Sequence, residues 1–66
     1  MAPMARIEYR VLLVDNDNAV RAMMTRALEL KGFEVVGAAS LTEALRHIVT
    51  ESFDVLITDP ARTQPN

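Results

Sequence analysis

The chain has 66 residues, with seven basic and nine acidic side chains, a formal net charge of −2 and no cysteine. This length allows one small domain, the lack of cysteine excludes disulfides and cysteine-ligated zinc, and the scattered basic residues do not form the stripe typical of nucleic-acid binding. No apolar run approaches the roughly 18 residues of a membrane span. We therefore expect a soluble cytoplasmic protein that binds neither nucleic acid nor membranes.

Composition changes divide the chain into three parts. Residues 1–8 contain Pro3 and no apolar periodicity, so we expect a flexible leader. Residues 60–66 are polar and contain two prolines, which predicts an unstructured tail. Between them, residues 9–59 alternate apolar and polar segments and are predicted to form the folded domain.

The first predicted strand begins at Tyr9 or Arg10 and ends at Val14, because its aliphatic, β-branched run is typical of a strand buried on both faces. A helix is predicted over residues 18–31, with Asp17 or Asn18 as its N-cap and a glycine just after its end. Its apolar residues recur at helical spacing and should face the sheet. They are Val20, Met23, Met24, Ala27 and Leu28.

The second half repeats this pattern. Residues 33–38 are predicted to form a strand, weakened by Gly37. Ser40 and Glu43 have the spacing of a capping box, which opens a second helix that continues to about Thr50. Residues 53–58 form a third predicted strand that ends at Asp59. The apolar stripe of the second helix is Leu41, Ala44, Leu45, Ile48 and Val49.

This alternation predicts an α/β fold with a parallel sheet and right-handed crossovers. If the first strand lies in the middle, the three strands take the order 2-1-3. The two helices can then cover one face of the sheet or both. The direction of winding reverses between the first and third strands.

Ligands of open α/β sheets bind beyond the carboxyl ends of the strands, at such a reversal. The two strands that flank it here end in Asp15 and Asp59. Neighbouring strands lie about 4.8 Å apart, so these carboxylates should face each other. Two converging oxygen donors suit a hard cation such as Mg²⁺, with water completing its coordination.

A simpler interpretation treats the same residues as a strand-end turn and a helix cap, with Asp59 and Pro60 as an ordinary strand ending. We favour the cap for Asp17 and Asn18, and the site for the pair of Asp15 and Asp59. A calcium-binding EF-hand loop is excluded, because its fifth and sixth positions would be alanine and valine.

His47 is the one histidine and lies beside the apolar stripe of the second helix, so we favour a solvated position over catalysis. No glycine-rich phosphate loop follows the first two strands, and no serine–histidine–acid set is present. An independent enzyme is therefore not expected.

The segments VLLVDND, GFEVVGAASLTEAL and FDVLITD occur in an order and at a spacing that resembles the N-terminal half of a response-regulator receiver domain, which has a flavodoxin-like doubly wound fold. The resemblance implies that Asp59 accepts a phosphoryl group from a histidine kinase. It also implies an Mg²⁺ site formed by Asp15, Asn16, Asp59 and the backbone carbonyl of Ala61. Charge on the phosphoryl oxygens would be neutralised by the cation.

Three departures from the family pattern predict poor phosphoryl chemistry. Asn16 supplies a neutral amide where the family has a second acid, which should weaken Mg²⁺ binding. Pro60 follows Asp59 and has no N–H to donate to a phosphoryl oxygen. The serine or threonine and the lysine that the family carries on its fourth and fifth strands lie beyond this sequence, which we interpret as a truncated receiver.

In such a half-domain the third strand, residues 53–58, becomes an aliphatic edge that can pair with another chain. We therefore predict a homodimer in which this strand meets its symmetry mate across a two-fold axis. The alternatives to a weakened phosphoacceptor are a dimerisation or partner-binding module without phosphoryl chemistry, and a gene fragment without function.

Overall fold

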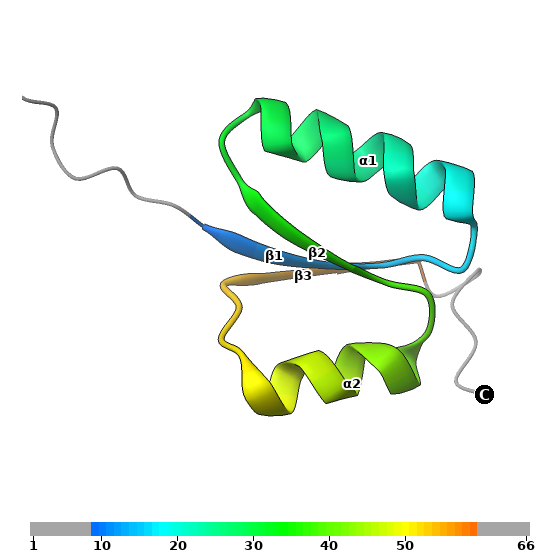
Figure 1. The fold of residues 1–66 in the computed structure, drawn as a ribbon, viewed down its shortest axis with the longest axis vertical. Coiled ribbons are helices and arrows are strands. Elements are labelled where there is room, and N and C mark those ends of the chain that lie inside the picture. The colour runs from blue at the N-terminus through cyan, green and yellow to red at the C-terminus, as the bar shows by residue number, and fades with distance from the viewer. Residues whose placement is uncertain (1–8, 60–66) are drawn as a thin grey trace, which may run out of the picture.

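Strands and helices alternate in the predicted order in this computed structural model, which describes residues 9–59 (Figure 1). The predicted leader and tail, residues 1–8 and 60–66, lie outside the described residues. The elements are β1 (Arg10–Val14), α1 (Asn18–Leu30), β2 (Glu34–Ala38), α2 (Leu41–Thr50) and β3 (Val55–Thr58).

The three strands form one parallel sheet in the order β2-β1-β3, which confirms the predicted topology. Val11 of β1 pairs with Val35 of β2 and with Val55 of β3, which sets the register on both sides. The helices lie on opposite faces of the sheet, α1 on one side and α2 on the other (Figure 1). This arrangement settles the choice that the sequence left open, because each right-handed crossover runs to a different side of β1.

The core is centred on β1, whose four residues from Val11 to Val14 are each no more than 1% exposed. On the α2 face, Leu12 and Val14 pack with Ala38 of β2 and Ala44 of α2. Three partly buried apolar side chains extend this cluster: Val36, Leu41 and Phe53. The aliphatic run therefore forms a central strand that is covered on both faces, as predicted.

Both ends of α1 are fixed by local hydrogen bonds. The Asp17 carboxylate accepts from the backbone N–H groups of Ala19 and Val20, at 2.9 and 3.1 Å, so Asp17 is the N-cap and Asn18 is the first helical residue. At the other end Gly32 has φ of 99°, a conformation that glycine adopts without strain. Its N–H donates to the Glu29 carbonyl at 3.0 Å, in the pattern expected at a glycine C′ position.

The start of α2 is capped by Ser40, whose hydroxyl accepts from the Glu43 N–H at 3.1 Å. The Glu43 carboxylate accepts from the N–H of Ala39, at 2.9 Å, one residue before the cap. The predicted capping box is therefore present with its return bond shifted by one residue. The return bond therefore satisfies the N–H of the residue before the cap instead of the N–H of the cap itself.

Two strands begin later than predicted, for identifiable reasons. The N–H of Phe33 donates to the Leu28 carbonyl at 3.2 Å and so belongs to the end of α1, and β2 starts at Glu34. Before β3, the Asp54 N–H donates to the Arg10 carbonyl, and the Asp54 carboxylate accepts the Arg10 N–H, both at 2.8 Å. A side chain thus takes the place of a backbone acceptor there, and β3 starts at Val55.

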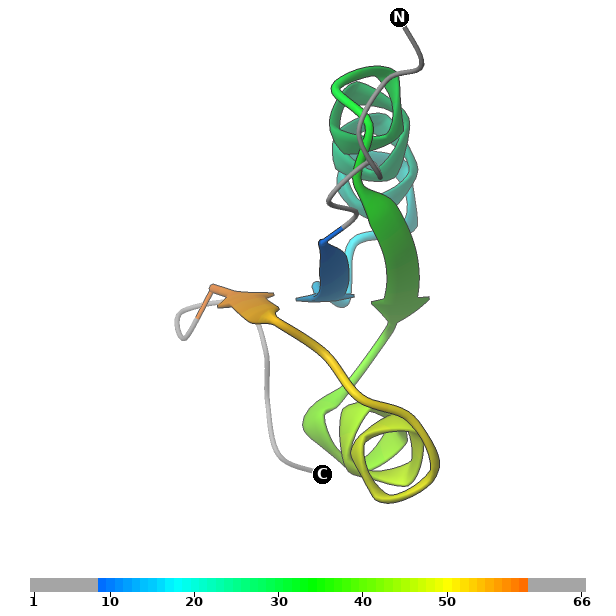
Figure 2. The same ribbon diagram turned by 90° about the vertical axis from the view of Figure 1, so that its left-hand side faces the viewer.

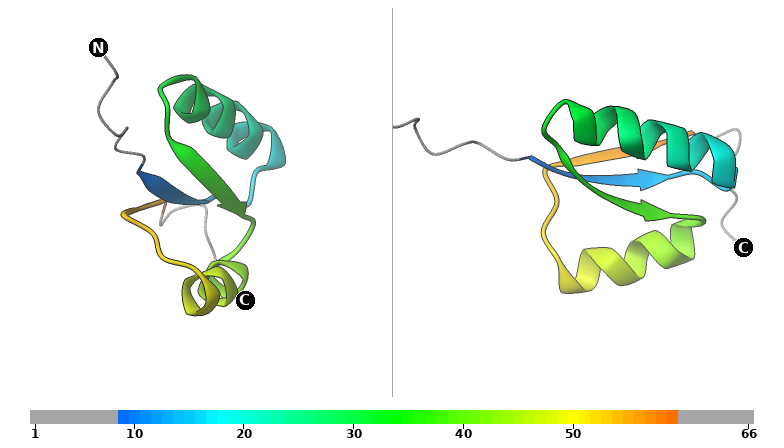
Figure 3. Two further views of the ribbon diagram at one scale, coloured as in Figure 1. Left: turned by 60° about the vertical axis from the view of Figure 1, so that its left-hand side comes forward. Right: turned by 45° about the horizontal axis from the view of Figure 1, so that its top comes forward.

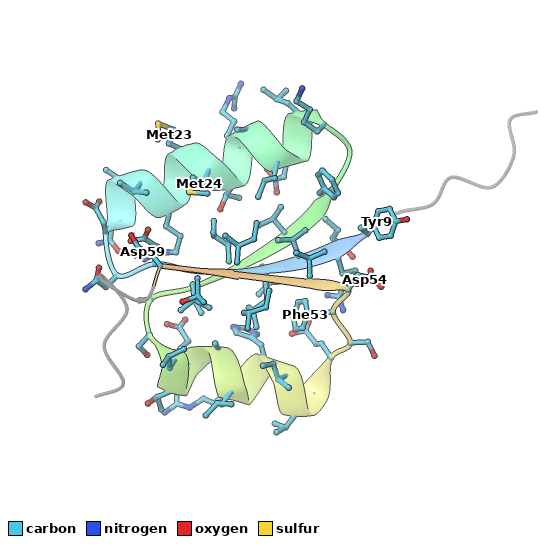
Figure 4. The ribbon with its side chains drawn as sticks, turned by 180° about the vertical axis from the view of Figure 1, so that it is seen from behind. Tyr9, Met23, Met24, Phe53, Asp54 and Asp59 are labelled. Carbon is cyan, nitrogen blue, oxygen red and sulfur yellow. The ribbon has the colours of Figure 1, made fainter. Side chains whose placement is uncertain are left out.

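The predicted apolar stripes are only partly buried. Met23 is 64% exposed and points away from the sheet, whereas its neighbour Met24 points toward it (Figure 4). On α2, Leu45 and Val49 are 60% and 80% exposed. The prediction that the whole stripe faces the sheet was therefore wrong for Met23, Leu45 and Val49. Within residues 9–59 no Cα atom of either helix lies within 8 Å of a Cα atom of β3, so the sheet beneath each helix is too narrow to cover a full stripe.

Figure 2 shows β3 extending away from both helices. Val55 and Leu56 are consequently 42% and 53% exposed, although they lie in a strand. An open groove of about 270 Å³ runs along the α2 side of this strand. Its apolar lining comes from Leu12, Ile48, Phe53, Val55 and Leu56.

Candidate functional site

The carboxyl ends of the three strands meet at one edge of the sheet, close to the start of α1 (Figure 3). Val14 of β1 is paired with Thr58 of β3, and the next residue on each strand is an aspartate. Asp15 and Asp59 therefore occupy neighbouring positions, at the roughly 4.8 Å spacing of adjacent strands. Figure 4 shows Asp59 at this edge, beside the first turn of α1.

Asp15 is held firmly. It is 4% exposed, and its N–H continues the sheet by donating to the Ala38 carbonyl at 3.0 Å. Its carboxylate Oδ1 accepts from the N–H of Asp17 at 2.8 Å, and its carbonyl accepts from Nη1 of Arg21 at 2.6 Å. A buried carboxylate is costly without such partners, so these bonds orient Asp15 as well as stabilise it.

The neighbouring polar residues have different roles. Asn16 is exposed, with its amide at the surface of the loop between β1 and α1. Asp17 uses Oδ1 to cap α1, as favoured from the sequence. Because Asp17 caps the helix, Asp15 and Asp59 are the two acids that the fold places at the ends of adjacent strands.

The donor chemistry of this edge is compatible with Mg²⁺, which proteins commonly hold through one or two carboxylates and several waters. Asp15 and Asp59 would supply the carboxylates, and Asn16 an amide oxygen. Among residues 9–59, no group of three histidine, cysteine, aspartate or glutamate side chains is arranged to hold a metal. Ala61, whose carbonyl was predicted as a further ligand, lies outside the described residues. The cation site therefore remains a prediction.

His47 is not the solvated residue that the sequence suggested. Its ring is half-buried, and Nδ1 lies 3.1 Å from Oε2 of Glu51, the C-cap of α2. The opposite oxygen of Glu51 accepts from Nη2 of Arg10 at 2.6 Å. This contact places His47 near the beginning of β1, at the opposite end of the sheet from Asp59.

Two arginines with structural roles were missed from the sequence. Arg10 joins Glu34, Glu51 and, through the latter, His47, and we call these four residues the Arg10 network. The pairing of Arg10 with Glu34 follows from the parallel register and could have been found once that register was assigned. Arg21 packs against Gly37, and a glycine inside a strand is a recognised sign of such close approach.

Residues 11–61 match the sequence family described as the response regulator receiver domain. The chain is 44% identical over 50 residues to the transcriptional regulatory protein PrrA of Mycobacterium tuberculosis, covering 76% of this chain and 22% of that protein. The Mycobacterium leprae PrrA gives the same identity and coverage.

The chain is also 34% identical over 55 residues to the CAI-1 autoinducer sensor kinase/phosphatase CqsS of Vibrio cholerae, covering 83% of this chain and 8% of that protein. It thus spans less than a quarter of each of these relatives. No solved structure gives a significant match.

None of the helices within residues 9–59 is long and apolar enough to cross a bilayer. The family match, residues 11–61, covers the whole of the βαβαβ unit except Arg10, and the sheet order is consistent with it. The chain belongs to the response regulator receiver domain family of two-component signalling.

Proposed function

We propose that this chain is a phosphoacceptor module in which Asp59 receives a phosphoryl group from a histidine kinase. The observation that carries the proposal is the register of β1 and β3, which puts Asp15 and Asp59 side by side at the carboxyl edge of the sheet. In the transfer, the phosphorus–nitrogen bond of a phosphohistidine would break, and a bond from phosphorus to a carboxylate oxygen of Asp59 would form.

The chain's own groups have separable tasks in this proposal. Asp59 is the nucleophile and is only partly buried, so a donor can reach it. Asp15 is buried and fixed by its bonds to Asp17 and Arg21, which suits a ligand whose position must not change. Mg²⁺, when bound by these residues, would offset charge on the phosphoryl oxygens.

We further propose that the chemistry is weaker than in receivers with two acids after the first strand. Asn16 adds no charge, and its exposed position costs little to change. Asp17 uses its carboxylate to cap α1, so it is not a simple substitute. Pro60 cannot donate a backbone hydrogen bond to a phosphoryl oxygen. Asn16→Asp should therefore tighten Mg²⁺ binding.

The test is to add beryllofluoride, a phosphoryl mimic, with Mg²⁺ and to follow backbone amide shifts. The parent should show saturable shifts around Asp15 and Asp59, and Asp59→Asn should abolish them. Glu29→Gln, which removes an exposed acid from α1, is the matched control and should behave like the parent. Equal shifts in the parent and in Asp59→Asn would refute the phosphoacceptor role.

A second function, association with another copy of the chain, is favoured by β3. In the sheet formed by the described residues, β3 pairs with β1 on one side and ends the sheet on the other. Its exposed Val55 and Leu56 add an apolar surface to that free edge. We propose that two copies pair their β3 strands antiparallel about a two-fold axis, because an edge with these properties is a template for strand addition.

Sedimentation equilibrium tests this second proposal. The parent should form a dimer, and Leu56→Lys should shift it to a monomer, because a lysine in an edge strand opposes pairing. Val49→Lys introduces the same charge on α2 at a more exposed position and should leave the dimer intact. A folded parent that stays monomeric at high micromolar concentration would contradict strand pairing.

We also propose a cytoplasmic location, where a kinase partner would meet the chain.

A further inference from the structure

The side chain of Arg21 connects α1, β2 and the loop that carries Asp15. Its aliphatic part lies over Gly37 in β2. A Cβ atom added at Gly37 would be 3.2 Å from Cδ and 3.4 Å from Cγ of Arg21. Such contacts are tighter than most side-chain packing, so a side chain at Gly37 would require the stem of Arg21 to shift by a few tenths of an ångström.

The guanidinium group of Arg21 reaches both ends of the loop between β1 and α1. Nη1 donates to the backbone carbonyl of Asp15, and Nη2 donates to Oδ1 of Asn18, each at 2.6 Å. The planar fork of arginine suits two acceptors held at a fixed separation, which the single ammonium of lysine does not match. The loop is thus closed by one side chain whose stem is itself fixed against the sheet.

We propose that Arg21 is a positioning residue for the cation site and that its aliphatic stem is held by packing against Gly37 of β2. The inference rests on the proposed function, because it concerns the Mg²⁺ site at Asp15 and Asp59. By holding the carbonyl of Asp15, Arg21 keeps the loop in the conformation in which the Asp17 N–H orients the Asp15 carboxylate. The partners that orient a metal ligand commonly change metal affinity about 10- to 100-fold when they are removed.

The charge of Arg21 acts in the opposite direction to its hydrogen bonds. A guanidinium near the site repels a cation, so removing the charge alone would tighten Mg²⁺ binding. Removing the bonds would loosen the loop and weaken binding. Because the two effects have opposite signs, Arg21→Lys, which keeps the charge, and Arg21→Gln, which removes it, separate them.

The first experiment is an Mg²⁺ titration without phosphodonor, followed by backbone amide shifts at a temperature where every variant is folded. Arg21→Lys should weaken Mg²⁺ binding about 10-fold, and Arg21→Gln should weaken it less, because the loss of the charge partly offsets the loss of the bonds. Arg26→Gln, which removes an exposed charge from the same helix, is the matched control and should bind as the parent does. Unchanged affinity in both Arg21 variants, or tighter binding in Arg21→Gln with no change in Arg21→Lys, would overturn the proposal.

The second experiment changes Gly37 instead of Arg21. Gly37→Ala should shift the stem of Arg21 by a few tenths of an ångström and weaken Mg²⁺ binding in the parent, but it should have no effect when combined with Arg21→Ala, since no long side chain then lies over it. Alanine is not inferior to glycine in a strand, so loss of binding would not reflect a weaker fold. Equal effects of Gly37→Ala in the parent and in Arg21→Ala would contradict the claim that Gly37 acts through its packing against Arg21.

A metal-free readout distinguishes failure of this inference from failure of the site. The Asp17 amide, which donates to Asp15, should exchange its hydrogen faster in Arg21→Gln than in the parent. Unchanged exchange would overturn the positioning role even if the parent binds Mg²⁺. If Asp15→Asn leaves Mg²⁺ binding intact, the site itself is wrong, and the role of Arg21 in it is overturned as well.

Discussion

The two ends of the sheet use charge in opposite ways. Where the strands begin, Arg10 lies between Glu34 and Glu51, with nitrogen–oxygen distances of 2.7 and 2.6 Å. Where they end, two acids, Asp15 and Asp59, occupy adjacent positions. Figure 4 shows the separation directly, with Phe53 and Asp54 at one end of β3 and Asp59 at the other.

In the Arg10 network opposite charges are paired, and the arginine makes further contacts besides its ion pairs. Nη1 of Arg10 also donates to the Ser52 carbonyl at 2.9 Å, and its guanidinium lies 5.0 Å from the centroid of the Phe53 ring. These contacts join β1, β2 and the segment after α2. An end whose charges are already satisfied holds the fold together and has little capacity for a ligand.

The carboxyl edge instead places two acids on adjacent strands. Adjacent like charges repel each other unless a cation or proton lies between them, so their arrangement is costly for folding and useful for binding. One small sheet thus has its paired charges where its strands begin and its candidate site where they end.

The largest effect should come from the strand that joins both ends. Leu12 is completely buried, and Leu12→Ala should cost about 2–5 kcal/mol, which is comparable to the stability of a whole small domain. The variant should be largely unfolded by circular dichroism at room temperature. Leu45→Ala, at a 60% exposed position, is the control and should melt near the parent. A cooperative, parent-like melt of Leu12→Ala would show that the core is elsewhere.

Arg10→Met should give the next largest loss of stability. The change keeps an apolar stem but leaves Glu34 and Glu51 without their shared cation and the Ser52 carbonyl without its donor. Chemical denaturation should show a clear drop in midpoint. Arg46→Met, on the exposed surface of α2, should change it little. Equal midpoints for the two variants would mean that the network adds nothing to the fold.

Acid should weaken the same end of the sheet. Hydrogen bonds from Arg10, and secondarily from His47, lower the pKa of Glu51 below its ordinary value of 4.5. A carboxyl whose folded pKa is depressed contributes stability above its unfolded pKa and loses it as the pH falls through the folded pKa. The denaturation midpoint should therefore fall as the pH drops below 4.5. In Arg10→Met this acid sensitivity should be smaller, and an identical pH profile would contradict the assignment.

The smallest effect, and one of opposite sign, is expected at the carboxyl edge. Asp59→Asn removes one of two adjacent like charges, so the metal-free protein should melt slightly higher than the parent. Thermal melts at low ionic strength would detect this, and added salt should reduce the difference. A lower melting temperature for Asp59→Asn would show that the carboxylate stabilises the fold rather than serving a ligand.

Much of the fold follows from local sequence. The cap at Asp17, the glycine after α1 and the buried run of β1 are each determined by residues within a few positions of one another. Alternating elements and the handedness of their crossovers then limit the sheet to very few orders. The adjacency of Asp15 and Asp59 is a consequence of that order, which is why the candidate pair could be predicted without coordinates.

Long-range side-chain contacts could not be predicted in this way. Glu34 could be found as a partner of Arg10 once the strand register was assigned, but Glu51 lies 41 residues away and outside any strand, and nothing in the sequence indicates that Arg10 meets it. The exposure of Met23 and Val49 likewise depends on how much sheet lies under each helix, which periodicity does not report.

By itself, the sequence determined the order of the elements, their caps, the family and the two aspartates of the candidate site, because local hydrogen bonding and apolar periodicity act over short distances. Only the tertiary structure decided that Arg21 lies over Gly37, that His47 contacts Glu51 and that β3 is left uncovered by either helix within residues 9–59. Those features depend on which surfaces the packed elements bring together, and packing is a property of the whole chain.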